Sequence, residues 1–323
     1  MSQGILIWAE HLRGQVSEIT FEMLGIGRQL ADALKVPLVA AVAGEGVTSL
    51  ANQLGMADKV LLVENPALTL APAATQASVL HALFQQEQAS LVLVGGTNVS
   101  LGVGTVLAIR TKLPYINFCK AARAEGDSII ATSQLFGGKI LADTRLPNHR
   151  GILSVYPGAF PAEAGRRAGT PELIPAAVEI APSPVKFEQF IEPETGDVDI
   201  TQQEVLVAVG RGIQSQDNIP LAEELAAALG GAVCASRPVI DQGWLPLSRQ
   251  VGKSGMTVKP RLYLALGISG APEHWEGMQG SRLIVAVNTD PKAPIFDGAH
   301  FGTTVDALDL LPVLTEKIKA RKG

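Results

Sequence analysis

Small and polar residues follow four apolar segments in the second half of the chain. Residues 205–209, 232–234, 262–266 and 283–287 are predicted to be buried strands separated by helical segments. The residues that follow these strands are Gly210-Arg211-Gly212, Ser236-Arg237, Ser269-Gly270 and Asn288. Ligands of open α/β sheets bind outside the carboxyl ends of the strands. We therefore expect a ligand site at this edge of a second domain.

The first of these strand ends resembles part of a dinucleotide fingerprint. Gly210 and Gly212 follow a strand, but Ser215 stands where a third glycine is required. A fold that binds NAD places a carboxylate after the next strand, and this chain has Ser236 and Arg237 there. The absence of a carboxylate at this position argues against NAD as the ligand. The remaining candidates are NADP, whose 2′-phosphate would pair with Arg237, and a different dinucleotide.

Two further motifs can each be interpreted in two ways. Gly252-Lys253-Ser254 is similar to the end of a P-loop, but Leu247 stands where that motif needs its first glycine, which argues against an NTPase. His274 follows a strand end and comes just after Pro272, at the expected start of a helix that would favour an anion. Both a ligand contact and a structural role remain open for His274.

Composition and spacing exclude several classes of protein. The chain has 26 Lys and Arg against 31 Asp and Glu with no basic block, so we expect no nucleic-acid partner. Cys119 and Cys234 lack the neighbours of a disulfide framework or zinc site, so we predict buried thiols in a reducing compartment and no metal. Apolar runs are far shorter than a membrane span, and no signal peptide precedes them. We expect a cytoplasmic protein with no catalytic residues of the hydrolytic type.

The 323 residues predict two α/β domains, each built on a mostly parallel sheet with flanking helices. The first covers residues 1–195 and the second residues 196–323, with the acidic segment 192–197 as the linker between them. Closely spaced strand candidates over residues 129–156 predict an antiparallel finish to the first sheet. Short strands are also expected near residues 178–180 and 185–187.

An ordered series of motifs across roughly 90 residues closely resembles the α subunit of electron-transfer flavoproteins, the family that includes the FixB-type proteins. The motifs are Gly210-Arg211-Gly212-Ile213, Cys234-Ala235-Ser236-Arg237-Pro238, Gln250-Val251-Gly252, Leu266-Gly267-Ile268-Ser269-Gly270-Ala271 and Val285-Ala286-Val287-Asn288-Thr289-Asp290-Pro291. The N-terminal Ile7-Trp8-Ala9-Glu10-His11 is similar to the family as well. The resemblance implies that the second domain is a Rossmann-like FAD-binding domain.

The resemblance also assigns site residues by matched position. The residues expected at the pyrophosphate, ribose and adenine of FAD are Arg211, Ser236, Ser269, Gly270, Ala271, Asn288 and Asp306. The residues expected beside the isoalloxazine ring are Arg237, Ser254 and His274, where a cation or hydrogen-bond donor favours the anionic reduced forms of the flavin. The remaining cofactor-binding positions are Gln250, Val251, Gly252, Lys253, Pro272, Glu273 and Ala307.

Lys253 and Glu273 depart from the family, which commonly has glutamine at both positions. A lysine there would add positive charge beside the flavin, and a salt bridge from Glu273 would cancel it. The sequence leaves the net effect on the flavin potential open.

The resemblance implies an electron carrier. Its first domain would contact a β subunit in a heterodimer, a dehydrogenase such as an acyl-CoA dehydrogenase would be the donor, and a quinone oxidoreductase would be the acceptor. Two alternatives stay open. One is the α subunit of an electron-bifurcating, NADH-dependent complex, and the other is an NADP-dependent oxidoreductase.

Overall fold

The computed structural model describes residues 4–167, 169–190 and 197–322, and it divides into two compact units between Gln189 and Phe190. The predicted boundary between residues 195 and 196 lies outside the described residues, as does all of the predicted linker except Asp197, so both stay predictions. Within the described ranges, every helix is too short or too polar to cross a membrane.

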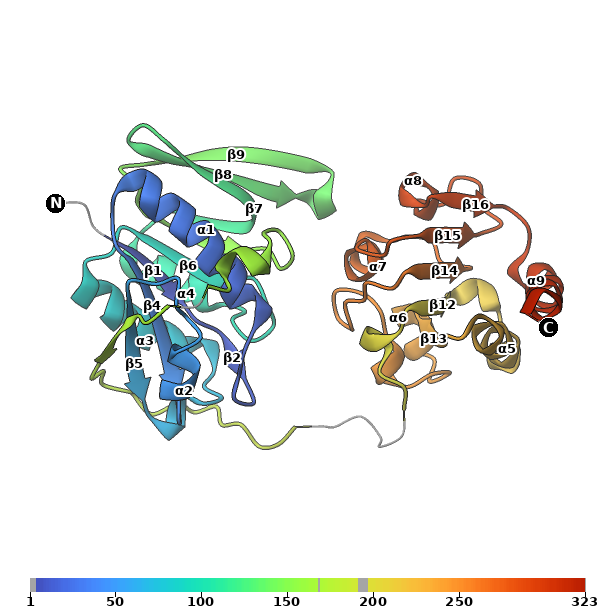
Figure 1. Ribbon diagram of the computed structural model, residues 1–323, viewed down its shortest axis with the longest axis horizontal. Coiled ribbons are helices and arrows are strands. Elements are labelled where there is room, and N and C mark those ends of the chain that lie inside the picture. The colour runs from blue at the N-terminus through green and yellow to red at the C-terminus, as the bar shows by residue number, and fades with distance from the viewer. Residues whose placement is uncertain (1–3, 168, 191–196, 323) are drawn as a thin grey trace. The chain divides into compact units, whose positions relative to one another are not determined.

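The first unit is built on a nine-stranded sheet (Figure 1). Along the sheet the strands are β11 (Glu172–Pro175), β5 (Lys59–Glu64), β4 (Leu38–Gly44), β1 (Ile5–Trp8), β6 (Leu91–Gly95), β10 (Gly151–Val155), β7 (Tyr115–Glu125), β8 (Ser128–Leu135) and β9 (Ile140–Pro147). Neighbours from β11 to β7 pair in parallel, and β7, β8 and β9 pair antiparallel. A short hairpin of β2 (His11–Leu12) and β3 (Gln15–Val16) stands apart.

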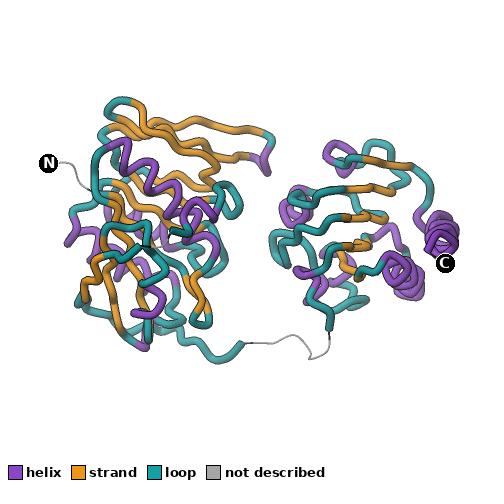
Figure 2. The backbone as a smooth tube through the Cα atoms, viewed as in Figure 1, coloured by secondary structure: helices purple, strands orange, loops and turns teal. Residues whose placement is uncertain are grey.

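Helices cover both faces of the parallel part of this sheet (Figures 1 and 2). They are α1 (Glu18–Leu34), α2 (Thr48–Ala51), α3 (Ala73–Glu87) and α4 (Val103–Thr111). Alternate residues of β1 lie on opposite faces of the sheet and belong to different hydrophobic cores. Ile5 and Ile7 pack with α1, while Leu6 and Trp8 pack with α3 and α4. A strand that is apolar at every position is the expected consequence of two covered faces.

Two strand predictions in the first unit need correction. The predicted antiparallel pairing is confirmed for β8 and β9, but β10 pairs in parallel with both β6 and β7. Residues 178–180 and 185–187 form no strand. Val178 and Ile180 pack against the core beside α3, while Pro182 and Pro184 lack the N–H groups that a sheet ladder needs. The apolar spacing there reflects packing of an irregular segment.

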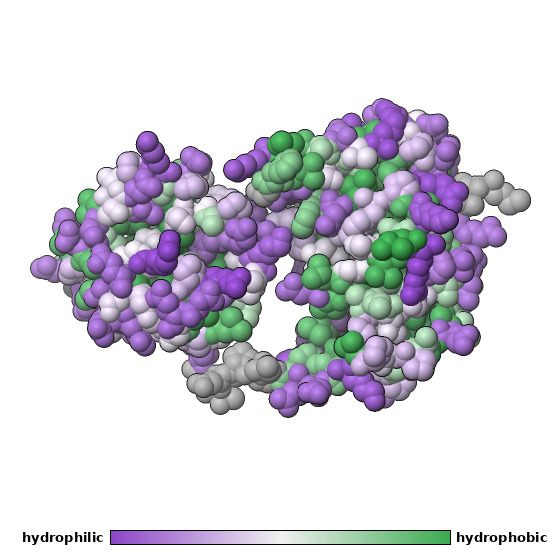
Figure 3. Space-filling view, turned by 180° about the vertical axis from the view of Figure 1, so that it is seen from behind, coloured by the Kyte–Doolittle hydropathy of each residue, from purple (hydrophilic) through white to green (hydrophobic). Residues whose placement is uncertain are grey.

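Large apolar side chains are exposed at the tip of the β8–β9 hairpin, and Figure 3 shows apolar surface there. The hairpin turns through a 3₁₀ segment, Phe136–Gly138. Phe136 is 75% exposed and Leu141 is 62% exposed, with Ile140 and Leu135 beside them. Clustered exposed apolar side chains of this kind are typical of interaction surfaces.

The second unit is a five-stranded, fully parallel sheet with helices on both faces (Figure 1). In sheet order its strands are β13 (Ala232–Ala235), β12 (Val205–Val209), β14 (Leu262–Leu266), β15 (Ile284–Val287) and β16 (Phe301–Thr303). Its helices are α5 (Ile219–Leu229), α6 (Arg237–Ile240), α7 (Pro272–Met278), α8 (Ile295–Gly298) and α9 (Ala307–Lys322). The fold class is therefore α/β in both units, as predicted.

An ion pair ties the start of the second unit to its sheet. The Arg249 Nε atom donates to Asp197 Oδ1 at 2.6 Å, and Arg249 Nη1 donates to the Val233 carbonyl on β13 at 2.7 Å. Ser248 also donates to the Asp197 carboxylate. The Arg249 guanidinium beside Asp197 is the main reason that the pKa of this carboxyl lies below its ordinary value of 3.8.

We expect Asp197→Asn to lower the free energy of unfolding by about 1–3 kcal/mol, because it leaves a half-buried guanidinium poorly paired. A lowered folded-state pKa stabilises the fold above the unfolded pKa, so the wild type should lose this contribution as the pH falls below 3.8. Urea unfolding at pH 7 and at pH 3 tests both points. Asp199→Asn is the matched control, since the Asp199 carboxylate accepts hydrogen bonds from nearby Thr201 and has no ion pair among the described residues. Equal stability of the two variants at pH 7 would contradict the assignment.

Candidate functional site

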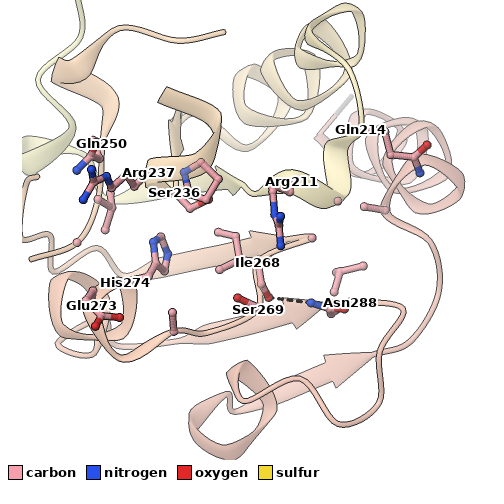
Figure 4. Close-up of a pocket in the computed structure, with 18 of the residues that line it drawn as sticks. Arg211, Gln214, Ser236, Arg237, Gln250, Ile268, Ser269, Glu273, His274 and Asn288 are labelled. Atoms are coloured by element: carbon pink, nitrogen blue, oxygen red, sulfur yellow. Dashed lines mark hydrogen bonds between the residues drawn. The ribbon is translucent and has the colours of Figure 1, made fainter. Parts of the chain in front are cut away.

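A pocket of about 730 Å³ lies at the carboxyl ends of the second unit's strands (Figure 4). Its volume is in the range of cavities that hold a cofactor-sized ligand. Because all five strands are parallel, the residues that follow them meet at this edge. The chain runs from β12 to β13 on one side and then returns to β14 on the other, so the order of strands reverses between β12 and β14. Such a switch point is where open α/β sheets bind ligands.

The pocket brings together nearly all of the residues predicted from the sequence. Those that line it are Arg211, Ser236, Arg237, Gln250, Val251, Gly252, Lys253, Ser254, Ser269, Ala271, Glu273, His274, Asn288, Asp306 and Ala307. Gly270 and Pro272 are not in the lining. Gly270 has a φ of +85°, and a Cβ there would lie 2.3 Å from the Ile295 backbone nitrogen, so it supports the loop from behind. Pro272 is the first residue of α7.

Seven lining residues were given no role at the cofactor by the sequence: Gly212, Gln214, Pro238, Gly267, Ile268, Val287 and Thr289. Most of them stand inside the motifs that carry the family resemblance, so the motifs located them without assigning them a role. Gln214 is different because it follows its motif with a positive φ of 68°. Nothing in the local sequence marks that backbone angle.

Two glycines let the ends of β12 and β14 approach each other closely. A Cβ on Gly212 would lie 2.5 Å from the Gly267 Cα, and a Cβ on Gly267 would lie 2.4 Å from the Gly212 Cα. Gly267 also has a φ of +62°, in the left-handed region. The Gly212 N–H donates to the Gly267 carbonyl at 3.1 Å. The floor of the pocket at the switch point is therefore bare backbone.

Cationic side chains stand at several places around the pocket. Arg211 points toward the segment that carries Ile268 and Ser269 (Figure 4), and no described side chain pairs with its guanidinium. Arg237 is 68% exposed and its Nε lies 3.3 Å from Asp241 Oδ2. The Lys253 ammonium lies 3.8 Å from Glu276 Oε2. Arg211 is thus a charge at the switch point that an anionic ligand group would neutralise.

Three of the predicted polar residues already have structural hydrogen bonds. Asn288 Nδ2 donates to the Ile268 carbonyl at 2.9 Å and so joins the ends of β15 and β14. Asp306 Oδ1 accepts from the Leu308 N–H at 2.9 Å, which caps the start of α9. Buried Gln250 donates to the Ser254 hydroxyl at 2.9 Å. These residues shape the pocket wall and hold Ser254 at its edge.

His274 lines the pocket, and one of its ring nitrogens is a buried polar atom without a hydrogen-bond partner among the described residues. Its Nε2 lies 2.9 Å from the Tyr263 hydroxyl, while Nδ1 is buried without a hydrogen-bond partner. Burial lowers the pKa of His274 to about 4, against a smaller opposing effect of the Val251 backbone. At neutral pH the imidazole is therefore neutral. The predicted helix start is confirmed, because α7 begins at Pro272 and runs for seven residues.

The described residues include no group of His, Cys, Asp or Glu that could hold a metal ion. Both cysteines are buried free thiols, and burial raises the pKa of each to about 12. They are accordingly protonated at neutral pH.

The sequence matches two described families. Residues 5–181 match the electron transfer flavoprotein domain, and residues 199–279 match the electron transfer flavoprotein FAD-binding domain. The electron transfer flavoprotein subunit alpha of Megasphaera elsdenii is 34% identical over 99% of this chain and 98% of its own. The chain belongs to the electron transfer flavoprotein α-subunit family. The cofactor of its matched C-terminal domain is FAD.

Other relatives extend over almost the whole chain. Protein FixB of Clostridium saccharobutylicum is 33% identical over 98% of this chain and 96% of its own length. The LctC subunit of a lactate dehydrogenase (NAD(+),ferredoxin) from Acetobacterium woodii is 34% identical over 98% of this chain and 77% of its own length. The family resemblance inferred from the motifs is thereby confirmed, and it includes the FixB-type proteins.

The pocket fits FAD on three structural counts. Its volume suits a dinucleotide, bare backbone at Gly212 and Gly267 admits a close approach, and the free Arg211 guanidinium complements a pyrophosphate. The unpartnered Nδ1 of His274 adds a polar atom that a flavin oxygen or nitrogen would satisfy. The family match favours FAD over the NADP alternative.

Proposed function

We propose that this chain is the α subunit of an electron carrier and that it holds FAD in a Rossmann-like second domain. The observation that carries this proposal is the buried, unpartnered Nδ1 of His274 in a pocket at the switch point of a family-matched FAD-binding domain. An orphaned buried polar atom costs about 1–3 kcal/mol unless a ligand satisfies it. The FAD ring is a ligand of suitable size and polarity.

The two ends of the pocket take different parts of the cofactor in this proposal. Arg211 and the backbone at Ser269 hold the pyrophosphate, and Asn288 and Asp306 form the wall on the adenosine side. Arg237, Ser254 and His274 lie beside the isoalloxazine ring. Gln250 keeps the Ser254 hydroxyl in place through its 2.9 Å hydrogen bond.

Bound FAD supplies the ability to accept and release electrons, and the protein sets how readily it does so. Neutral His274 donates a hydrogen bond but brings no full charge. Arg237 and Lys253 stand at the exposed rim, where Asp241 and Glu276 offset part of their positive charge. Donors and cations near the ring favour its more electron-rich forms. The chain itself carries out no bond cleavage in this scheme.

The family membership supports a heterodimer with a β subunit. We place the contact on the first unit, where the exposed apolar tip of the β8–β9 hairpin offers a surface suited to a partner. The donor in this scheme is a dehydrogenase, such as an acyl-CoA dehydrogenase, and the acceptor is a quinone oxidoreductase.

A second candidate function is an α subunit in an NADH-dependent, electron-bifurcating complex. It is favoured by the relative LctC, a subunit of a lactate dehydrogenase that is named for NAD(+) and ferredoxin. The two candidates differ in the β subunit, which would carry a second FAD in the bifurcating complex. NADH alone should reduce the flavin of that complex and should leave the simple carrier oxidised.

We expect His274→Ala to keep FAD bound but to lower its midpoint potential by tens of millivolts, on the order of one lost hydrogen bond. The reason is that the variant removes a donor that favours the electron-rich flavin. A redox titration against a reference dye measures the shift. His300→Ala serves as the control, because His300 bonds to Ile284 at the start of β15 and does not line the pocket. An unchanged potential would remove His274 from the flavin ring.

The function is tested by mixing the purified heterodimer anaerobically with a dehydrogenase and its substrate. Loss of the oxidised flavin absorbance of the heterodimer, followed by its recovery when a quinone oxidoreductase and quinone are added, is the expected result. Flavin that stays oxidised with every dehydrogenase tried, but is reduced by NADH, would favour the bifurcating alternative.

A further inference from the structure

A line of three buried polar side chains leads from the core of the second unit to the FAD pocket. Cys234 on β13 lies with its Sγ 3.9 Å from the Tyr263 hydroxyl on β14. That hydroxyl lies 2.9 Å from His274 Nε2 on α7. Cys234 and Tyr263 are fully buried, and His274 is 7% exposed. The line ends at His274 Nδ1, which has no partner among the described residues.

Tyr263 is an unusual member of this core. It packs among apolar side chains such as Leu206, Ala265 and Met278, in the cluster between the sheet and α7. A phenylalanine would fill the same space without a buried hydroxyl, which must be hydrogen-bonded to offset its desolvation. The hydroxyl is satisfied on both sides, by a thiol and by an imidazole.

The direction of these hydrogen bonds follows from a count of protons. Burial raises the pKa of Tyr263 well above its ordinary value and lowers that of His274, so hydroxyl and imidazole are both neutral at pH 7. Tyr263 has one proton to donate. If it points to Nε2, a strong O–H···N bond forms, the thiol of Cys234 donates to the phenol oxygen, and the imidazole proton must reside on Nδ1.

The opposite direction is much less favourable. An Nε2–H group would donate to the phenol oxygen, and the Tyr263 proton would then have only the Cys234 sulfur, a weak acceptor 3.9 Å away. It would also leave a bare lone pair on buried Nδ1 in place of an N–H donor.

We propose that Tyr263 is a positioning residue for the cofactor site, because its hydroxyl fixes His274 as the Nδ1–H tautomer and so directs an N–H donor into the pocket. The inference rests on the proposed function only for the identity of the group that accepts this hydrogen bond. The tautomer itself is a property of the chain alone. Cys234 has a lesser part, since it satisfies the phenol oxygen from the other side.

The tautomer can be measured directly by ¹⁵N NMR of the full chain labelled in histidine. The sequence has five histidines, and loss of one set of signals in His274→Gln identifies those of His274. In the wild type at pH 7 we expect a protonated Nδ1 and a bare Nε2. A protonated Nε2 in the wild type would overturn the proposal without any variant of Tyr263.

Tyr263→Phe should shift the tautomer, because the donor that holds Nε2 bare is gone, and the Nε2–H form should become populated. Cys234→Ala is the matched control. It removes a side chain from the same line but keeps the Tyr263–His274 bond, so it should retain the Nδ1–H form. An unchanged tautomer in Tyr263→Phe would show that the phenol does not set it.

The effect on the cofactor is a separate readout. In the FAD-loaded heterodimer, Tyr263→Phe should change the ratio of reduced to oxidised flavin at a fixed potential by up to about tenfold toward the oxidised form, as one neutral hydrogen bond implies. A ratio equal to that of the wild type would contradict the positioning role. If the chain binds no FAD, the proposed function fails while the NMR result still decides the tautomer.

Discussion

Gly267→Ala is expected to destabilise the second unit by about 2–5 kcal/mol and to abolish FAD binding by any molecules that remain folded. A left-handed residue with a Cβ costs about 1–2 kcal/mol, and overpacking adds about 1–3 kcal/mol. The Cβ would lie 2.4 Å from the Gly212 Cα. The nearest atoms all belong to the Gly212 backbone, which cannot rotate away as a side chain can. The ends of β12 and β14 must separate, and that separation deforms the pocket floor.

The two parts of this cost can be separated with a matched control. Gly243 also has a left-handed φ, +71°, but a Cβ there would meet nothing within 4 Å. Gly243→Ala should therefore show only the conformational cost and should bind FAD like the wild type. Urea unfolding and FAD fluorescence titration give the two readouts. Equal stability of Gly267→Ala and Gly243→Ala would show that the close approach of the strands is not needed.

Arg211→Ala is expected to weaken FAD binding by about 10- to 100-fold, with little change in stability. Charge-assisted hydrogen bonds contribute about 1.5–3 kcal/mol, and 1.4 kcal/mol corresponds to a factor of ten in the dissociation constant. Stability should change little because the exposed Arg211 has no partner among the described side chains. The FAD affinity of Arg211→Lys should lie between those of the wild type and Arg211→Ala, since lysine keeps the charge but cannot bind a phosphate bidentately.

The control for Arg211 is another arginine of the same unit. Arg261 is 66% exposed, pairs loosely with Glu204 at 3.8 Å and does not line the pocket. Arg261→Ala changes the net charge by the same amount, so any difference between the two variants reports the local contact. The affinity of the wild type should also fall more steeply with salt than that of Arg211→Ala. Wild-type affinity in Arg211→Ala would show that another group holds the pyrophosphate.

The sequence predicted the pocket better than it predicted the sheets. Apolar strands end in small or polar residues, and parallel pairing forces such ends together, so Arg211, Ser236 and Asn288 were found by local pattern alone. The parallel pairing of β10 was missed because its position between β6 and β7 depends on contacts far along the chain. The segment after β11 has the apolar spacing of strands because Val178 and Ile180 pack against the core, but Pro182 and Pro184 lack the N–H groups that a sheet ladder needs.

The electrostatics of the site could not be read from residue types. His274 was expected to support negative charge on the flavin with help from a helix N-terminus. The sequence left open whether the ring acts as a cation or as a neutral hydrogen-bond donor, and its environment favours the neutral ring, because burial lowers its pKa to about 4 and the Tyr263 hydroxyl lies 2.9 Å from Nε2. Tyr263 stands in the middle of an apolar strand sequence, where nothing distinguishes its hydroxyl from a packing residue. Only the fold brings β14 and α7 together and reveals the pair.

The central claim is that the second unit holds FAD, and the most direct test is an absorption spectrum of the chain coexpressed with its β subunit. We predict flavin bands, FAD as the released cofactor after denaturation, and at least one FAD per heterodimer. Arg211→Ala purified in parallel should be depleted of cofactor. A heterodimer that is colourless and remains so after FAD is added would contradict the account.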